Sequence, residues 1–480
     1  MKPELAKTLA AADLRGWIEV GVEYGKGELA IRVPPGCRTL GMKETRPLPD
    51  AGAAIREALA RPIGSPTLGE IVKAKGKDPA TVTVCIATSD ITRPVPYRGE
   101  AGILGPLLAA LHQAGVRREN VTLLVGTGTH RPSTPEEKAT MFGAEVAGAY
   151  RIDDHVCDDE ASFVTLGKTL SGSEILVNRL FVEADVKIAT GLVEAHFMAG
   201  VSGGRKAVCP ALVSRKTIEH FHSARFLDSP KATNLVLEGN PCHEESLEVA
   251  RRVGVDFAVN TVLDRRLALV GVYAGHLERS HEAAYQQVKG FVAVTVEAEH
   301  DIVLTHGGYV GINHYQNAKA ACNALPAVRE KGFVILAACE RDSDLVGPVT
   351  YRTLLHLLKL QGWERYLKML LSPDWKFTRD QWEPQMWGKV LAKVGEEGLI
   401  YCSAKLPPRE AEIVPGRLGW EFVDSPPGAP GADDVALARA MVQNAVISCV
   451  HEARRGGKEP SFAFVKEGPY VIPLPAGSPG

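Results

Sequence analysis

The sequence lacks the long apolar runs and the charge excess that would tie a chain to a membrane or to nucleic acid. No apolar run approaches the roughly 20 residues that a membrane span needs. The 55 lysines and arginines nearly balance the 57 aspartates and glutamates, which leaves a formal net charge of -2. The N-terminal stretch also lacks the apolar core and the cleavage site of a secretory signal. We therefore expect neither a membrane nor nucleic acid as a partner.

Pairs of cysteines in CxxC spacing are absent as well. The nine cysteines are scattered along the chain, which argues against a disulfide framework or a structural zinc site. This usage predicts a reducing compartment, and we expect the protein in the cytoplasm.

The length of 480 residues is too great for one ordinary core, so two large domains are expected. Hydrophobic residues make up 45% of the chain and charged residues 23%, which is typical of globular proteins. We place the first domain at residues 1–290 and the second at residues 291–432. The last part, residues 433–480, is expected to form a helix and a strand that fold back on one of the two.

Short β-rich runs alternate with helical patterns in the first half. The expected strands are Thr81–Thr88, Val121–Val125 and Asp185–Thr190. The run Gly99–Ala114 has amphipathic helical spacing. A second helix is expected after Thr134, because Thr134, Pro135 and Glu137 suit its N-cap, first position and capping box. This alternation predicts an α/β fold with mostly parallel sheets flanked by helices.

The second half continues the alternation. A strand is expected at Ile302–Thr305, a helix at His314–Glu330 and another strand at Phe333–Ala338. The stretch Leu354–Val394 reads as helical. A Pro/Gly-rich loop at Ser425–Asp433 precedes a further helix, and the run Phe462–Leu474 is apolar enough for a strand.

Four polar motifs begin where predicted strands stop. They are Ser89–Pro94, Gly126–Pro132, Glu194–Lys206 and Gly307–Lys319. Open parallel sheets bind ligands at the carboxyl ends of their strands, so this shared placement predicts one site. Asp90 could accept from a ribose hydroxyl and Arg93 could bind a carboxylate or phosphate, although such a pair is more often a structural ion pair. The Gly203–Gly204 turn could bring backbone N–H groups to an anion, or be only a turn.

Histidines recur in the same motifs. His130 and His196 each lie in a strand-end loop, where an imidazole is hard to bury for packing alone. Together with His222 they could ligate zinc, so a zinc-dependent hydrolase is one alternative. In an extended segment, His220 and His222 would point to opposite sides, and only one of them would face a metal.

Four stretches together resemble the nickel-pincer nucleotide lactate racemase family. They are Asp90–Pro94 (DITRP), Gly126–Pro132 (GTGTHRP), His196–Lys206 (HFMAGVSGGRK) and Tyr315–Lys319 (YQNAK). Their order and approximate spacing agree with the family, and the closing Gly468–Tyr470 also resembles its C-terminus.

The resemblance implies a specific cofactor, nickel(II) pyridinium-3,5-bisthiocarboxylate mononucleotide. It implies that the first domain binds this cofactor, that the second caps the substrate, and that the active site lies in the cleft between them. Lys206 would carry the cofactor covalently, and His222 would be the protein ligand of nickel. The cofactor-binding positions are Asp90, Ile91, Thr92, Arg93, Lys206, Pro210 and His222. Cofactor-synthesis proteins are implied as partners for loading.

The implied reaction is inversion of C2 of a 2-hydroxy acid. His130 and His196 would be the catalytic acid/base pair, while Arg93, Gln316 and Lys319 would bind the substrate. The Cα–H of such an acid is too weakly acidic for ordinary proton abstraction. Hydride transfer to and from the cofactor, through a planar 2-keto acid, avoids the carbanion, and a histidine near its neutral pKa can both take and give the hydroxyl proton.

Two departures from the family pattern lie near the expected substrate. Ala195 stands where the family commonly has proline, and Tyr309–Ile312 (YVGI) replaces a Tyr-Pro-Leu-Asp stretch. They predict lactate or a related, larger or more apolar 2-hydroxy acid as substrate. A non-catalytic cofactor carrier is a further alternative, against which the His130 and His196 pair argues.

Overall fold

The computed structural model describes residues 3–424, 434–454 and 457–477. The chain forms two compact units. The central unit spans Glu44–Phe291, and the terminal unit combines Met1–Lys43 with Val292–Gly480. We describe each unit by itself.

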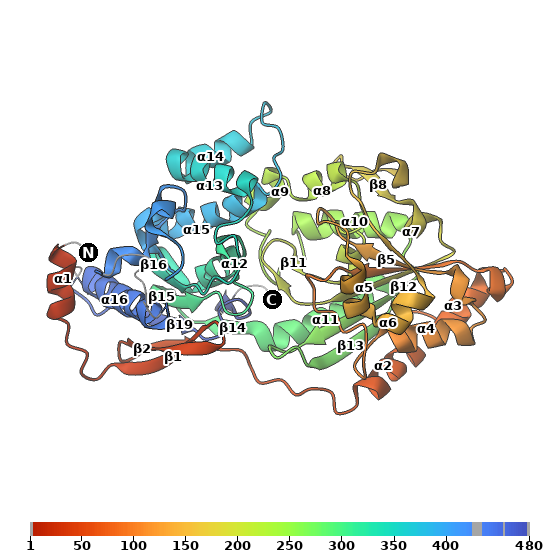
Figure 1. Cartoon of the computed structure of the whole chain (residues 1–480), viewed down its shortest axis with the longest axis horizontal. Helices are drawn as coiled ribbons and strands as arrows, with labels where there is room; N and C mark the ends of the chain where they lie inside the picture. Colours follow the sequence, from red (N-terminus) through yellow and green to blue (C-terminus); the bar gives the residue numbers. More distant parts are fainter. Residues whose placement is uncertain (1–2, 425–433, 455–456, 478–480) are drawn as a thin grey trace. The chain divides into compact units, whose positions relative to one another are not determined.

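This division corrects the expected place of the N-terminus. The sequence put residues 1–43 in the first domain, but they belong to the terminal unit. The reason is a long-range pairing, since β3 (Arg38–Leu40) runs parallel to β19 (Phe462–Val465). Figure 1 shows the same mixture of chain ends, with the red β2 (Gly27–Val33) near the blue α16 (Asp434–Arg454), which it contacts.

The central unit is built on a six-stranded sheet. Its strands, in spatial order, are β13 (Leu269–Gly275), β12 (Phe257–Leu263), β9 (Val186–Leu192), β4 (Val84–Ser89), β5 (Val121–Gly126) and β6 (Arg151–Asp154). All neighbours pair in parallel except β12 and β13. Two antiparallel pairs accompany it, β7 (Phe163–Lys168) with β8 (Glu174–Asn178), and β10 (Ala195–His196) with β11 (Gly200–Val201).

Helices flank this sheet. They are α2 (Ala51–Ala60), α3 (Leu68–Ala74), α4 (Leu104–Gln113), α5 (Pro135–Phe142), α6 (Ala144–Ala149), α7 (Arg179–Glu183), α8 (Arg215–Phe221), α9 (Ala224–Asp228), α10 (Pro241–Val253) and α11 (Leu277–Val292). Side chains of α2, α3 and α4, among them Ile55 and Leu107, form one buried core with Ile86 and Ile188 of the strands. Burial on this scale is the main stabilising contribution to such a unit.

The elements predicted for this unit are confirmed, with bounds that shift by a few residues. The three expected strands appear as β4, β5 and β9, and the amphipathic helix begins at Leu104 instead of Gly99. The capping box of α5 is present, because Thr134 accepts from the Glu137 N–H and Glu137 accepts from the Thr134 N–H.

The terminal unit has its own six-stranded sheet, parallel throughout. The spatial order is β18 (Arg417–Leu418), β17 (Leu399–Cys402), β16 (Val328–Ala337), β15 (His300–His306), β19 and β3. Beside it lie the hairpin of β1 (Ile18–Tyr24) and β2, and the parallel pair of β14 (Ala293–Val296) and β20 (Ile472–Pro475). The mostly parallel sheets with flanking helices in both units confirm the predicted α/β class.

The helices of this unit are α1 (Pro3–Ala10), α12 (His314–Ala324), α13 (Val349–Gln361), α14 (Trp363–Leu370), α15 (Trp382–Gly398) and α16. Apolar side chains of α16 and of β1 and β2 form a core with β15 and β16. Helix α12 contacts α15, and both contact β16. Within the described chain, no helix combines the length and apolarity that crossing a membrane requires.

Two expectations for the second half change. The helix predicted at 314–330 ends at Ala324, because a short turn containing Pro326 leads directly into β16. The apolar run Phe462–Leu474 forms two strands, β19 and β20, in place of one. The expected loop at 425–433 lies outside the described residues.

Candidate active site

Three neighbouring strands of the central sheet end at one edge. Strand β4 lies between β5 and β9, and its last residue, Ser89, pairs with Gly126 at the end of β5. Asp90, His130 and Glu194 follow these strand ends within a few residues. The parallel arrangement therefore brings three of the four motifs to the edge where such sheets bind ligands.

Asp90 and His130 form a bonded pair at this edge. The Nδ1 atom of His130 lies 2.6 Å from Oδ2 of Asp90, and the Thr92 hydroxyl donates to Oδ1 of Asp90 at 2.6 Å. Burial raises the pKa of Asp90, but the hydrogen bonds from His130 and Thr92 outweigh it and the pKa is lowered. An ionised carboxylate only accepts, so Nδ1 of His130 carries the hydrogen. A neutral His130 then holds its lone pair on Nε2, as a base requires.

Arg93 links the Asp90 loop to the segment before His196. Its guanidinium donates to Oε1 of Glu194 at 2.9 Å, and each side chain is about one-third exposed, 36% and 34%. The sequence had assigned Arg93 a ligand but Glu194 no role. The only hint of this pairing was that both residues follow strand ends.

His196 is held in a different way. It lies in β10, and its Nδ1 accepts long hydrogen bonds from the N–H groups of Met198 and Ala199, both at 3.3 Å. Because backbone N–H groups only donate, Nδ1 must hold the lone pair in this arrangement. The neutral ring then carries its hydrogen on Nε2, the opposite tautomer to that of His130.

Lys206 and His222 meet around an aromatic ring. The Lys206 ammonium lies 4.8 Å from the centre of the Phe221 ring, and the His222 ring stands edge-on to Phe221 at 4.7 Å. Burial, followed by the charges of Arg205 and Arg93, lowers the pKa of Lys206 to about 7. Burial, followed by the charge of Lys206, lowers the pKa of His222 to about 3. The group therefore combines an amine that is substantially neutral near pH 7 with a neutral imidazole.

The orientation of His222 comes from helix α8. His222 is the C-cap of this helix, and its Nδ1 donates to the Ile218 carbonyl at 3.0 Å. Nε2 then holds the lone pair, which is the form that ligates metals. The expected extended geometry at His220 and His222 is wrong, because His220 lies in the last turn of α8. The Nε2 atom of His220 contacts the Ser171 hydroxyl at 2.7 Å.

Packing explains the Gly203–Gly204 turn. Both glycines have positive φ. A Cβ at Gly203 would lie 2.6 Å from the Val193 side chain, and a Cβ at Gly204 would lie 2.6 Å from the His281 ring. The Gly204 N–H donates to the Asn260 side chain at 2.9 Å. This turn therefore fixes the backbone ahead of Lys206, and at least one of its N–H groups already has a protein partner.

Ile91 and Pro210 are two further residues that were expected to bind the cofactor. Ile91 is exposed at 41%. Pro210 follows a cis peptide bond after Cys209, and the next residue, Ala211, accepts from the Gly128 N–H at 3.1 Å. Pro210 thus lies beside the loop that carries His130.

Gln316 and Lys319 lie in the terminal unit, one turn apart on α12. The Lys319 ammonium donates to Oε1 of Gln316 at 2.8 Å. Glu383 of α15 is buried, and its Oε2 is a buried oxygen for which the described residues supply no partner. Burial raises the pKa of Glu383 to about 8, against the opposing charge of Lys319. Sequence patterns gave no indication of this carboxyl group.

The histidines do not assemble the zinc site of the alternative hypothesis. Within the described residues, no three His, Cys, Asp or Glu side chains come together as a metal site. His130, His196 and His222 instead have the separate partners given above. A three-ligand zinc hydrolase is therefore not supported.

The fold is that of an α/β protein in which histidine, carboxylate and guanidinium side chains meet at the ends of parallel strands. Residues 24–234 match the family model described as the lactate racemase N-terminal domain. The lactate racemase of Lactiplantibacillus plantarum is 33% identical over 70% of this chain and 77% of its own length. That of Thermoanaerobacterium thermosaccharolyticum is 30% identical over 78% of this chain and 85% of its own length.

Solved structures agree with these relatives. The lactate racemase apoprotein of T. thermosaccharolyticum superimposes with a TM-score of 0.79 at 27% identity, covering 95% of this chain and all of that one. A Thermotoga maritima protein shares the fold, with a TM-score of 0.60 at 17% identity over 90% of this chain and all of its own. The chain belongs to the lactate racemase family. It is an isomerase, specifically a racemase.

Proposed function

We propose that this racemase inverts C2 of a 2-hydroxy carboxylic acid, lactate or a related larger acid, with a nickel-pincer nucleotide attached at Lys206. The observation that supports it most is the arrangement of Lys206 and His222 around Phe221. The resemblance of the motifs to the nickel-pincer family supplies the identity of the cofactor.

The residues fit the demands of that cofactor. A covalent link through nitrogen needs an unprotonated amine, and the pKa of Lys206 is lowered to about 7. A single protein ligand for nickel needs a neutral imidazole with a fixed tautomer, which the bond from His222 to the Ile218 carbonyl provides. Because the cofactor brings its own donors, one histidine is sufficient, in keeping with the absence of a three-ligand group among the described residues.

The chain's own side chains handle the proton and the carboxylate. When bound, the nickel-pincer nucleotide would supply an acceptor and donor for the C2 hydride. His130, held by Asp90, takes the hydroxyl proton of one enantiomer, and His196 serves the opposite orientation of the 2-keto acid. Arg93, Gln316 and Lys319 supply cations and an amide for the carboxylate.

The residues ahead of α12 support the proposed substrate class. Tyr309 is 66% exposed with the Arg341 guanidinium 4.5 Å from its ring centre, and Ile312 is 36% exposed. These apolar surfaces precede Gln316 on the chain and support a 2-hydroxy acid with a side chain larger than methyl. None of the nine cysteines, all of them within the described residues, forms a disulfide, which supports a reducing compartment, the cytoplasm.

A loading experiment tests the proposal. The chain is produced with the cofactor-synthesis proteins, and pure enantiomers of lactate, 2-hydroxybutyrate and 2-hydroxyisocaproate are followed by chiral chromatography. We expect each accepted acid to reach a one-to-one mixture, and intact-mass spectrometry to show an adduct on the protein. Racemisation of none of these acids by adduct-bearing protein would contradict the proposed substrate class.

Matched variants test the two cofactor positions. Lys206→Arg keeps the cation but cannot form the amide-type link, so the adduct should disappear. His222→Gln should lose nickel, whereas His220→Gln, two residues away and bound to Ser171, should keep it. An adduct in Lys206→Arg, or nickel lost from His220→Gln alone, would refute these assignments.

A further inference from the structure

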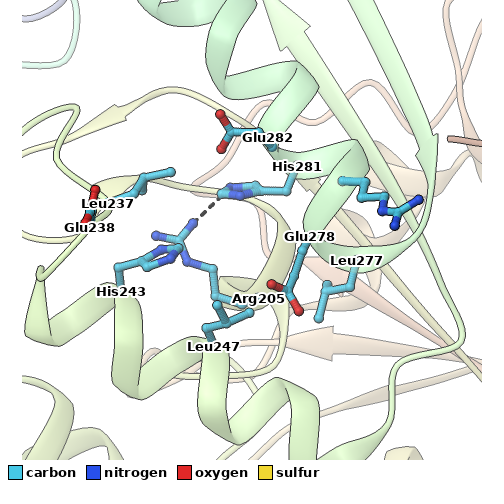
Figure 2. Close-up of a pocket in the computed structure, with 10 residues that line it drawn as sticks. Arg205, Leu237, Glu238, His243, Leu247, Leu277, Glu278, His281 and Glu282 are labelled. Atoms are coloured by element: carbon cyan, nitrogen blue, oxygen red, sulfur yellow. Dashed lines mark hydrogen bonds between the residues drawn. The ribbon is translucent and has the colours of Figure 1, made fainter. Parts of the chain in front are cut away.

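One cavity in the central unit contains none of the residues assigned to racemisation. It has a volume of about 520 Å³ and lies between the first turns of α10 and α11, next to the turn that precedes Lys206. Arg205 is among its lining residues, and Figure 2 shows the Arg205 guanidinium between the rings of His243 and His281. Leu237, Leu247 and Leu277 supply apolar wall.

Arg205 is a buried cation, and no carboxylate of the described residues forms an ion pair with it. Its side chain is 1% exposed. One terminal nitrogen donates to the Ala199 carbonyl at 2.7 Å, while Nε has no partner within the described structure. Burial lowers the pKa of Arg205 to about 9, and the nearby groups that oppose this shift are the thiols of Cys242 and Cys209 and not carboxylates. A buried charge in this condition is unfavourable until an acceptor reaches it.

His281 cannot accept a hydrogen bond from Arg205 and at the same time donate one to the Ser202 carbonyl. Its Nε2 lies 2.9 Å from a terminal nitrogen of Arg205 and 2.8 Å from the Ser202 carbonyl oxygen. The guanidinium requires a lone pair on Nε2, whereas the carbonyl requires a hydrogen there. A neutral ring can satisfy only one of them, so the cluster has one acceptor too few.

His243 adds another unsatisfied atom on the same cavity. Its Nδ1 is buried, and nothing in the described residues pairs with it. Burial, followed by the charge of Arg205, lowers the pKa of His243 to about 3, so its ring is neutral. A neutral ring can donate to a ligand oxygen held at Arg205.

The rim limits the charge of the ligand. Glu238, Glu278 and Glu282 line the cavity, and Glu278 is paired with Arg251 at 2.6 Å. Carboxylates at the rim repel an anion with two or more charges more strongly than they repel an anion with one charge.

The lining also indicates the shape of the ligand. The guanidinium fork of Arg205 matches a planar carboxylate. Apolar wall favours a hydrocarbon chain beyond it.

We propose that this cavity binds a small monocarboxylate with an apolar chain, whose carboxylate accepts from Arg205 and His243. With a ligand oxygen on Arg205, His281 is released to donate to the Ser202 carbonyl. The site is separate from the racemase site, and its occupancy does not depend on the cofactor.

Titration of the full-length chain, produced without cofactor, tests this inference. Isovalerate is the probe, and the dissociation constant is measured by calorimetry together with the thermal unfolding midpoint. We expect isovalerate to bind and to raise the midpoint, and phosphate and zwitterionic leucine to bind at least tenfold more weakly. Absence of isovalerate binding, or tighter binding of phosphate or leucine, would overturn the proposed ligand class.

Three variants locate the binding. Arg205→Met should weaken isovalerate at least tenfold and, without ligand, should not lower the unfolding midpoint, because an unpaired buried charge is removed. Leu247→Trp narrows the cavity while leaving Arg205 in the sequence, and should weaken binding equally. Arg279→Gln removes the same charge from an exposed residue of the same lining and should change the dissociation constant less than twofold.

The outcomes separate the cavity from other carboxylate sites. Unchanged binding in both Arg205→Met and Leu247→Trp would show that isovalerate sits elsewhere, for example at Lys319. An equal loss in Arg279→Gln would show general electrostatic attraction. If Arg205→Met does not fold, Leu247→Trp alone decides, because it keeps the guanidinium and its bond to Ala199.

Discussion

The two candidate bases of the central unit are held by opposite kinds of partner. In the loop after β5, His130 gives its Nδ1 hydrogen to the Asp90 carboxylate at 2.6 Å, and its side chain is 54% exposed. In β10, His196 instead accepts from two backbone N–H groups at 3.3 Å. The first arrangement leaves a lone pair on Nε2, and the second leaves a hydrogen there.

This difference gives the two histidines unequal starting points. A carboxylate partner stabilises an imidazolium, so His130 can take a proton without rearrangement. Backbone N–H groups oppose a hydrogen on Nδ1 of His196, so His196 must leave these long contacts before its Nε2 can act as a base. Two residues that look equivalent in the sequence are therefore expected to respond differently to changes around them.

Removal of either imidazole is expected to have the largest effect. His130→Ala and His196→Ala should each lower kcat/KM about 10²- to 10⁴-fold, the usual contribution of a positioned acid/base group. Because the equilibrium constant between enantiomers is one, the loss must be equal in both directions. Chiral assays of cofactor-loaded protein measure it. His220→Ala is the matched control, and activity within tenfold of wild type in either catalytic variant would contradict the assignment.

Asp90→Asn should impair His130 and leave His196 unaffected. An amide can hold His130 in either tautomer, so we expect kcat to fall about 10²-fold, the lower end of what a positioned acid/base group contributes, with little change in KM. Thr92→Val removes one hydrogen bond to Asp90 but keeps its charge, and should cost less than tenfold. Steady-state kinetics of both variants provide the test, and equal losses would mean that the charge of Asp90 is not what matters.

Most of the strands and helices around the two histidines could be predicted from the sequence, because they depend on local patterns. The apolar runs of β4, β5 and β9 and the Thr134 cap are complete within a few residues. The motifs at the strand ends then follow from parallel pairing. By contrast, the pairing of β3 with β19 joins residues more than 400 positions apart, and no local pattern reveals it.

The details of the site depended on tertiary contacts. The sequence placed Asp90, Arg93 and His130 at one edge, but could not show that Asp90 holds His130 while Glu194 holds Arg93. It gave Arg205 no role. Its complete burial results from the fit of the glycine turn against His281, which only the folded chain shows.

The dependence of stability on pH should test whether the ionised Asp90 carboxylate stabilises the folded chain. The pKa of Asp90 is lowered in the folded state, since the hydrogen bonds of His130 and Thr92 outweigh burial. Its contribution is therefore present above the unfolded pKa of about 3.9, and is lost as pH falls through the folded pKa. Urea unfolding from pH 7 to pH 3 should show wild type exceeding Asp90→Asn at pH 7, by an amount that shrinks in acid. A difference independent of pH would contradict this account.

Glu194→Gln should have the smallest effect, because it cuts the link between the two regions without removing either histidine. Both partners are about one-third exposed, so the loss of stability should stay below about 1 kcal/mol. The released Arg93 should bind the substrate carboxylate better and lower KM several-fold. Glu183→Gln, which breaks the surface pair with Arg179, is the control. An unchanged KM in Glu194→Gln would show that Arg93 does not bind the substrate.

The most direct test of the account is a single-turnover measurement with each pure enantiomer. Cofactor-loaded His130→Ala and His196→Ala are mixed with a substoichiometric amount of either enantiomer, quenched in acid, and assayed for the 2-keto acid. If each histidine serves one orientation of the C2 oxygen, the two variants should retain 2-keto acid formation for opposite enantiomers. Retention for the same enantiomer in both variants would contradict the account.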